Sequence, residues 1–70
     1  MVVCKAEKYM VPSLAAMAAG EDLAAAAERM EIAIKRGTIW VGYSAVGQSL
    51  GFVECYGRPD KKSFAQRVRL

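Results

Sequence analysis

The hydrophobic pattern of the chain changes from a helical period to an alternating one at Gly37, and this change constrains the fold more than any other feature. Before Gly37 the apolar side chains recur at helical spacing, in a stripe made of Leu23, Ala26, Ala27, Met30, Ala33 and Ile34. After Gly37 apolar and polar residues alternate, which is typical of β-strands. Helices followed by strands predict an α+β fold, with the helices packed on one face of a small, mainly antiparallel sheet.

The first half of the chain predicts a strand and two helices. Residues 1–6 alternate as a first strand, and Pro12 suits the first turn of a helix, where its missing N–H costs nothing. Glu21 and Asp22 precede the second helix, where the helix dipole favours negative charge. Gly37 follows that helix as the expected left-handed cap.

The second half predicts three strands joined by turns. The runs 39–46 and 50–56 flank Gly47-Gln48-Ser49, as in a β-hairpin. A turn over 57–60 follows, and residues 63–70 alternate again as a last strand. We therefore expect the order strand, helix, helix, strand, strand, strand in a single domain over residues 1–70.

The chain has 70 residues, which allows one small domain, and it contains no histidine. Without an imidazole there is no Ser-His-Asp triad, no histidine general base and no ordinary zinc site. Two isolated cysteines, Cys4 and Cys55, are more typical of buried reduced thiols than of a disulfide, although their pairing stays open. The sequence predicts no catalytic residue, no cofactor site and no metal site.

The N-terminal residues predict a cytoplasmic location. Lys5, Glu7 and Lys8 come before any long apolar run, so we expect no secretory signal. The first long uncharged stretch, from Tyr9 to Gly20, is shorter than a membrane span. We therefore expect no membrane contact.

The glycine-punctuated hairpin carries a resemblance to a known family. A first strand is followed by a helix that opens at Val11-Pro12-Ser13-Leu14, by a second helix, and by the segments Gly37-Thr38-Ile39-Trp40-Val41-Gly42-Tyr43 and Gly47-Gln48-Ser49-Leu50-Gly51-Phe52-Val53. This order resembles the N-terminal half of the GNAT acetyltransferase superfamily over about residues 2–56. The resemblance implies the half-domain fold of that family, with residues 63–70 as the start of its fourth strand.

The same resemblance bears on acetyl-CoA binding. In the family, a glycine-containing loop after the fourth strand binds the pyrophosphate of acetyl-CoA through backbone N–H groups at a helix N-terminus. The chain ends at Leu70, before such a loop. We therefore expect no independent acetyltransferase activity, and no cofactor-binding residue is transferred from the family.

Positive charge is concentrated in the second half of the chain. Residues 1–34 carry three basic and five acidic side chains, a net charge of −2, whereas residues 35–70 carry seven and two, a net charge of +5. Such a gradient can steer a protein to nucleic acid, an acidic membrane face or an acidic protein patch. The same charges also suit a solvated edge strand that is protected from aggregation. The candidate contact residues in this segment are Arg58, Lys61, Lys62, Arg67 and Arg69.

Trp40 is a further candidate contact, because it alternates out of phase with Ile39, Val41 and Tyr43. If the sheet face that it occupies is uncovered, Trp40 and Val46 form a patch for a partner. The other aromatic residues of the strands are expected in the core, beneath the helices.

Two residues depart from the pattern of their elements. Glu54 lies among apolar residues of its strand, and we favour an ion pair with Arg67 or Arg69 on a neighbouring strand over a perturbed carboxylate. Ile32 lies outside the apolar stripe of its helix. Together with the open edges of a small sheet, Ile32 favours a partner or a homodimer.

These features lead to three functional hypotheses. The leading one is a small non-catalytic protein-interaction module, an inhibitor or adaptor that blocks a larger protein or nucleoprotein complex. Small folds of this kind are common among phage and mobile-element proteins that act on host machinery, including anti-defence inhibitors. One alternative is a truncated GNAT-like half-domain that is active only as a dimer or with a second chain. The other is a small nucleic-acid-binding protein that uses the basic C-terminal segment.

Overall fold

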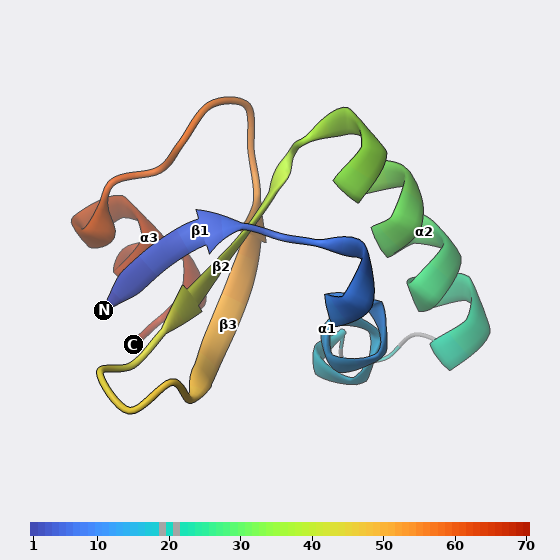
Figure 1. The fold of residues 1–70 in the computed structure, drawn as a ribbon, viewed down its shortest axis with the longest axis horizontal. Helices are drawn as coiled ribbons and strands as arrows, with labels where there is room; N and C mark the ends of the chain where they lie inside the picture. Colours follow the sequence, from blue (N-terminus) through green and yellow to red (C-terminus); the bar gives the residue numbers. More distant parts are fainter. Residues whose placement is uncertain (19, 21) are drawn as a thin grey trace.

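The chain runs through a strand, two helices, a hairpin and a final helix in the computed structural model, which describes residues 1–18, 20 and 22–70 (Figure 1). The elements are β1 (Val2–Lys5), the 3-10 turn η1 (Lys8–Met10), α1 (Val11–Met17), α2 (Leu23–Arg36), β2 (Ile39–Tyr43), β3 (Ser49–Glu54) and α3 (Lys61–Val68). The α+β class is confirmed. The predicted last strand over 63–70 is wrong, because most of this segment belongs to α3.

The helix α2 lies where the sequence indicated. The Asp22 carboxylate accepts a hydrogen bond from the Ala25 backbone N–H at 3.3 Å, which satisfies a donor of the first turn. Gly37 is left-handed, with φ of 71°, and its N–H donates to carbonyls of the last turn. Glu21, the other charge expected at this start, lies outside the described residues.

The main core lies between α1, α2 and one face of the sheet. Pro12 is in the first turn of α1, as expected, and Leu14 on this helix is buried. The buried side chains of this cluster are Ala6, Met10, Val11, Leu14, Met30, Ala33, Ile39 and Val41. The long helix α2 therefore contributes the apolar stripe that its period predicted.

The sheet has three antiparallel strands in the order β1-β2-β3, so that β2 is central and β1 and β3 form the edges. Val41 of β2 pairs with Cys4 on one side and Phe52 on the other. Since side chains alternate across a strand, Ile39 and Val41 face α1 and α2, while Trp40 and Gly42 face the opposite side.

The helix α3 covers this opposite face (Figure 1). A second core cluster joins Phe64 of α3 to Val3 of β1 and Val53 of β3. Phe64 has an exposed fraction of 0%. The expectation that the helices pack on one face only is therefore wrong.

A pair of glycines explains how α3 comes so close to the sheet. Gly42 and Gly51 are direct cross-strand partners. A Cβ atom at Gly42 would lie 2.7 Å from Phe64 Cζ and closer still to Cε1, and one at Gly51 would lie 3.2 Å from Val68 Cγ1. The two glycines thus form a floor without side chains, on which Phe64 and Val68 rest one helical turn apart.

Candidate functional site

The helix α3 is fixed at both ends as well as along its inner side. The Asp60 carboxylate accepts a hydrogen bond from the Ser63 backbone N–H at 2.6 Å, as an N-cap does. At the other end Arg69 is left-handed, with φ of 57°, and its N–H donates to the carbonyls of Ala65 and Gln66. With Phe64 buried beneath it, α3 presents its outer side in one orientation relative to the sheet.

Four predicted contact residues lie on α3 or at its C-cap, and we refer to their exposed charges together as the α3 basic face: Lys61, Lys62, Arg67 and Arg69. All four are exposed. Within the described part of the chain, their side chains form no ion pair and no hydrogen bond. The one acidic residue of the segment 55–70 is Asp60, and its carboxylate caps the helix. The basic face therefore carries four positive charges that are free to meet an external anion.

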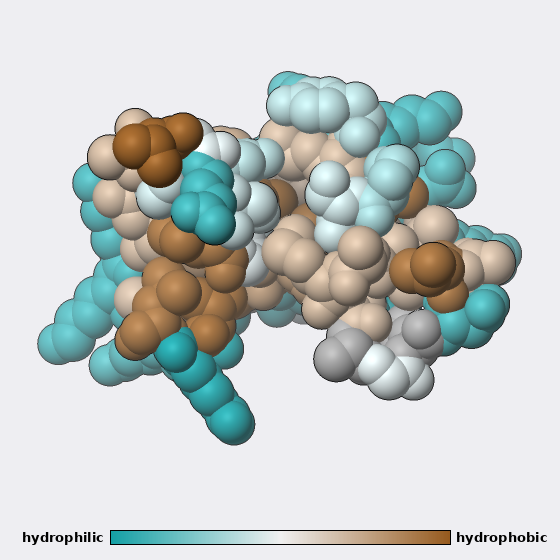
Figure 2. Space-filling view, turned by 90° about the horizontal axis from the view of Figure 1, so that it is seen from below, coloured by the Kyte–Doolittle hydropathy of each residue, from teal (hydrophilic) through white to brown (hydrophobic). Residues whose placement is uncertain are grey.

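A shallow groove of mixed polar and apolar lining lies against the outer edge of β3, and we call it the edge groove. Its lining residues are Met17, Leu50, Gly51, Phe52 and Val68, and its volume is about 300 Å³. Met17 comes from α1 and Val68 from α3, so the groove lies between helices on opposite faces of the sheet. Figure 2 shows hydrophobic side chains gathered on the half of the molecule that holds the sheet and α3, next to long hydrophilic side chains.

The sequence pattern alone does not reveal the edge groove, because it predicts a strand over residues 63–70. Two signals could have found it. Phe64 and Val68 are four residues apart, which is helical spacing, and Asp60 stands at an N-cap position before them. The glycines of the two hairpin strands also mark a place where another backbone approaches closely.

Arg58 has a structural partner in the fold. Its guanidinium Nη2 donates to the Val3 carbonyl oxygen at 2.9 Å. The Ala6 N–H donates to the Ile39 carbonyl oxygen at 2.9 Å. Because every second residue of an antiparallel strand bonds to the same neighbour, the carbonyl of Val3, an odd number of residues away, points away from β2. Arg58 therefore caps the open edge of β1, a role separate from that of the α3 basic face.

Trp40, the other predicted contact, is half-buried against the second core cluster. The Lys5 ammonium lies 5.7 Å from the centroid of the Trp40 ring. Its indole Nε1 is buried and has no hydrogen-bond partner in the described part of the chain. Val46 is 88% exposed, but it follows the end of β2 whereas Trp40 is near its start. The condition for a Trp40–Val46 patch, an uncovered sheet face, is not met, since α3 covers that face.

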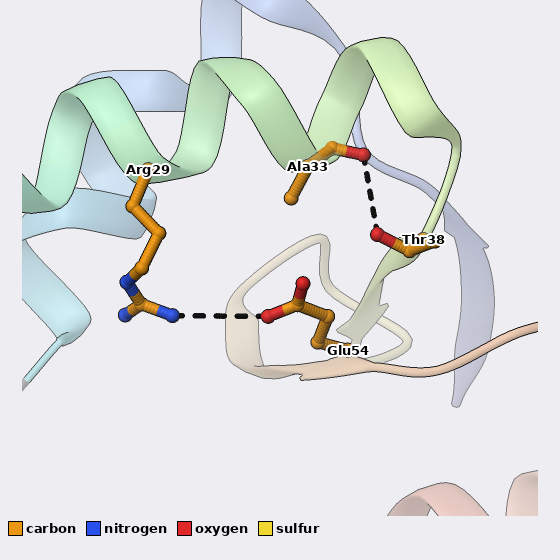
Figure 3. Close-up of polar contacts among 4 residues, drawn as sticks. All are labelled: Arg29, Ala33, Thr38 and Glu54. Carbon is orange, nitrogen blue, oxygen red and sulfur yellow. Dashed lines mark hydrogen bonds and ion pairs between the residues drawn. The ribbon is translucent and has the colours of Figure 1, made fainter.

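Glu54 forms its ion pair with α2 (Figure 3). The distance from Arg29 Nη1 to Glu54 Oε2 is 3.7 Å, and the two side chains are 45% and 48% exposed. A pair this exposed contributes at most about 1 kcal/mol. The interpretation of Glu54 as the partner of Arg67 or Arg69 is wrong, because Glu54 faces α2 and the two arginines belong to α3 and its C-cap.

The two cysteines are free and lie on opposite faces of the sheet. Cys4 pairs with Val41 and shares its face, whereas Cys55 packs against the cluster under α3. The Cys55 thiol donates a weak hydrogen bond to the Gly57 carbonyl at 3.4 Å. A disulfide between Cys4 and Cys55 would have to pass through the sheet, so this fold excludes it.

Ile32 lies in a second hollow, of about 350 Å³, along α2. The hollow is lined by Lys8, Glu28, Glu31, Ile32, Ile34 and Lys35. The Ile32 side chain is 47% exposed there. The hollow mixes both signs of charge and therefore favours neither cations nor anions.

Neither a metal centre nor a membrane span occurs in residues 1–18, 20 and 22–70. No three Cys, Asp or Glu side chains there cluster as metal ligands, and no helix there is long and apolar enough to cross a membrane. Comparison with models of protein families, with curated proteins and with solved structures gives no match. The functional argument therefore rests on the geometry of the α3 basic face and the edge groove.

Proposed function

We propose that the protein is a small non-catalytic interaction module that docks on an acidic surface of a larger protein. It does so through the α3 basic face and the edge groove, and it acts as an inhibitor or adaptor by occupying that surface. The observation that carries this proposal is the position of Val68. This residue lines the groove, and its two neighbours in the sequence, Arg67 and Arg69, belong to the basic face.

The arrangement has the two components that protein interfaces use. Interfaces combine an apolar centre, which is fully desolvated on binding, with a polar and charged rim. The groove supplies apolar surface, and the basic face supplies the charge beside it. Because α3 is capped and its inner side is packed, little ordering entropy is lost when it docks. Its charges also accelerate the encounter with an anionic partner.

Nucleic acid binding would use the same charges, but the aromatic residues do not support it. Single strands bind to sheets whose uncovered face presents aromatic rings for base stacking. Here helices lie on both faces of the sheet, and Trp40 and Phe64 pack beneath α3. The most exposed aromatics, Tyr9 at 74% and Tyr56 at 95%, lie in η1 and in the loop after β3.

The test is a capture experiment with three tagged proteins in an extract of the cells that make the protein. The first is the wild type, the second is Arg67→Glu with Arg69→Glu, and the third is Lys35→Glu with Arg36→Glu. The third is a matched control, because both pairs lie at the C-terminal end of a helix and each changes the net charge equally. A lysine-reactive cross-linker then maps the contact by mass spectrometry.

We expect the wild type and the α2 control to capture the same protein, cross-linked through Lys61 or Lys62, and the α3 variant to lose it. Equal capture by the α3 variant contradicts the proposal. Capture that disappears after nuclease treatment favours nucleic acid instead. Heat on titration with acetyl-CoA, at micromolar affinity, favours the GNAT-like half-domain, whereas the proposal expects none.

A further inference from the structure

The two edges of the sheet differ in what they offer a partner. On β1, Arg58 donates to the outward Val3 carbonyl. On β3, the Cys55 N–H donates to the Thr38 carbonyl at 2.8 Å. This bond determines which residues of β3 bond to β2, namely every second one counted from Cys55. The N–H and C=O groups of Phe52 and Glu54 therefore point away from β2, and no strand pairs with them in the described part of the chain. The outer edge of β3 is open.

The edge groove lies along this open edge, where an added strand would run. An added strand would lie about 4.8 Å from β3, between Met17 on one face of the sheet and Val68 on the other. The floor of the groove is β3 itself, through Leu50, Gly51 and Phe52. An incoming segment could thus form main-chain hydrogen bonds and bury apolar side chains at once.

The two walls of the groove favour different side chains on the two faces of an added strand. On the α1 side, an added strand meets Met17 and Phe52, so its side chains there should be apolar. On the α3 side it meets Val68, and the exposed charged side chains of α3 and its C-cap are all basic, so the charged side chains of the added strand should be acidic. Because side chains alternate along a strand, one segment satisfies both walls when apolar and acidic residues alternate.

A second copy of the chain does not fit this requirement. Pairing β3 with β3 would present Gly51 and Val53 to the α3 side of the other copy, and neither is acidic. It would also bring two α3 basic faces toward each other, and like charges repel. The occupant is therefore a segment of another protein.

We propose that the open edge of β3 binds an extended partner segment in which apolar and acidic residues alternate, so that the segment becomes a fourth strand beside α3. This inference rests on the proposed function and specifies the part of the partner that docks. It is a case of β-strand addition, in which main-chain bonds give affinity and alternate pockets give specificity.

The test is an NMR titration of the wild-type protein with a synthetic peptide of about eight residues that alternates valine and glutamate. One control peptide is methylated on the amide nitrogens of alternate residues, so that it cannot pair along its whole length with an edge. A second control has lysine in place of glutamate. The readouts are the amide shifts and the hydrogen exchange of Phe52 and Glu54.

We expect the parent peptide to shift and protect the Phe52 and Glu54 amides, with binding about tenfold weaker for each control peptide. No shift at this edge with the parent peptide at about 1 mM, or equal binding of the methylated peptide, overturns the inference. The two proposals fail separately. If Arg67→Glu with Arg69→Glu loses the captured protein while the methylated peptide binds as well as its parent, α3 docks its partner without strand addition.

Discussion

Substitution of Gly42 by alanine tests the contact that holds α3 on the sheet. The φ angle of Gly42 is not positive, so alanine fits the backbone there. In the absence of a neighbour, the lower entropy of the unfolded chain would make Gly42→Ala stabilising by about 0.4–1 kcal/mol. The new Cβ, however, would lie 2.7 Å from Phe64 Cζ and closer still to Cε1.

The two effects have opposite signs, which makes the experiment decisive. Overpacking of a filled core costs about 1–3 kcal/mol, so we expect a net loss of about 1–2 kcal/mol in the free energy of unfolding. A domain of this size has only about 3–5 kcal/mol in total, so the loss is easily measured. Urea unfolding followed by the fluorescence of Trp40, the single tryptophan of the chain, gives the free energy.

The same substitution in a Phe64→Leu protein identifies the atoms that cause the loss of stability. Phe64→Leu removes Cε1 and Cζ, the two ring atoms that the new Cβ would approach most closely. We expect Gly42→Ala to cost less in the Phe64→Leu protein than in the wild type, which is a non-additive pair. The double variant also remains informative if Gly42→Ala alone fails to fold. Gly42→Ala as stable as the wild type, or strictly additive costs, would refute the packing of α3 on the glycine floor.

Three further predictions follow from single contacts. Asp60→Ala removes the cap of α3 and should lower the free energy of unfolding by about 1 kcal/mol in urea, whereas an unchanged value would mean that α3 needs no cap. Arg58→Ala uncovers the Val3 carbonyl and should increase concentration-dependent association in light scattering, and a scattering mass equal to that of the wild type would remove its role as an edge cap. Burial, followed by the nearby charges of Cys4, Tyr9 and Glu7 when ionised, raises the pKa of Tyr43. The folded chain therefore keeps the Tyr43 proton to higher pH than the unfolded chain does, and the free energy of unfolding should fall as the pH rises above about 10. This fall should be smaller in Tyr43→Phe. If urea unfolding gives the same pH dependence for both proteins, the prediction is contradicted.

The elements with a single consistent signal could be predicted from the sequence. The helix α2 has its stripe, its Asp22 cap and its Gly37 end, and all three agree. The hairpin alternates and turns at a glycine, and the structure places β2 and β3 there. In both cases local propensity, period and turn residues indicate the same structure.

The last helix was missed because its signals conflict. Phe64 and Val68 fit a period of 3.6 as well as a period of 2, and the segment is too short for the periods to separate. A charged alternating run beside a small sheet then favoured an edge strand. With α3 misassigned, the second covered face and the edge groove could not be predicted, since the first depends on Phe64 packing over Gly42 and the second on Val68 packing over Gly51.

The polar side of the site could be predicted in part. Lys61, Lys62, Arg67 and Arg69 were recognised as one group from charge alone, and the structure places all four at the surface on α3 or its C-cap. Arg58 could not be separated from them, because its bond to Val3 joins residues far apart in the chain. Long-range contacts of this kind leave no local signature in one sequence.

The dissociation constant of the captured partner tests the docking proposal most directly. It is measured by calorimetry at low and high salt for the wild type, for Arg67→Glu with Arg69→Glu, and for Lys35→Glu with Arg36→Glu. We expect the α3 variant to bind at least about tenfold more weakly than the wild type at low salt, with a smaller difference at high salt. The α2 control should stay within about threefold of the wild type. Equal weakening of the two variants would contradict docking through α3.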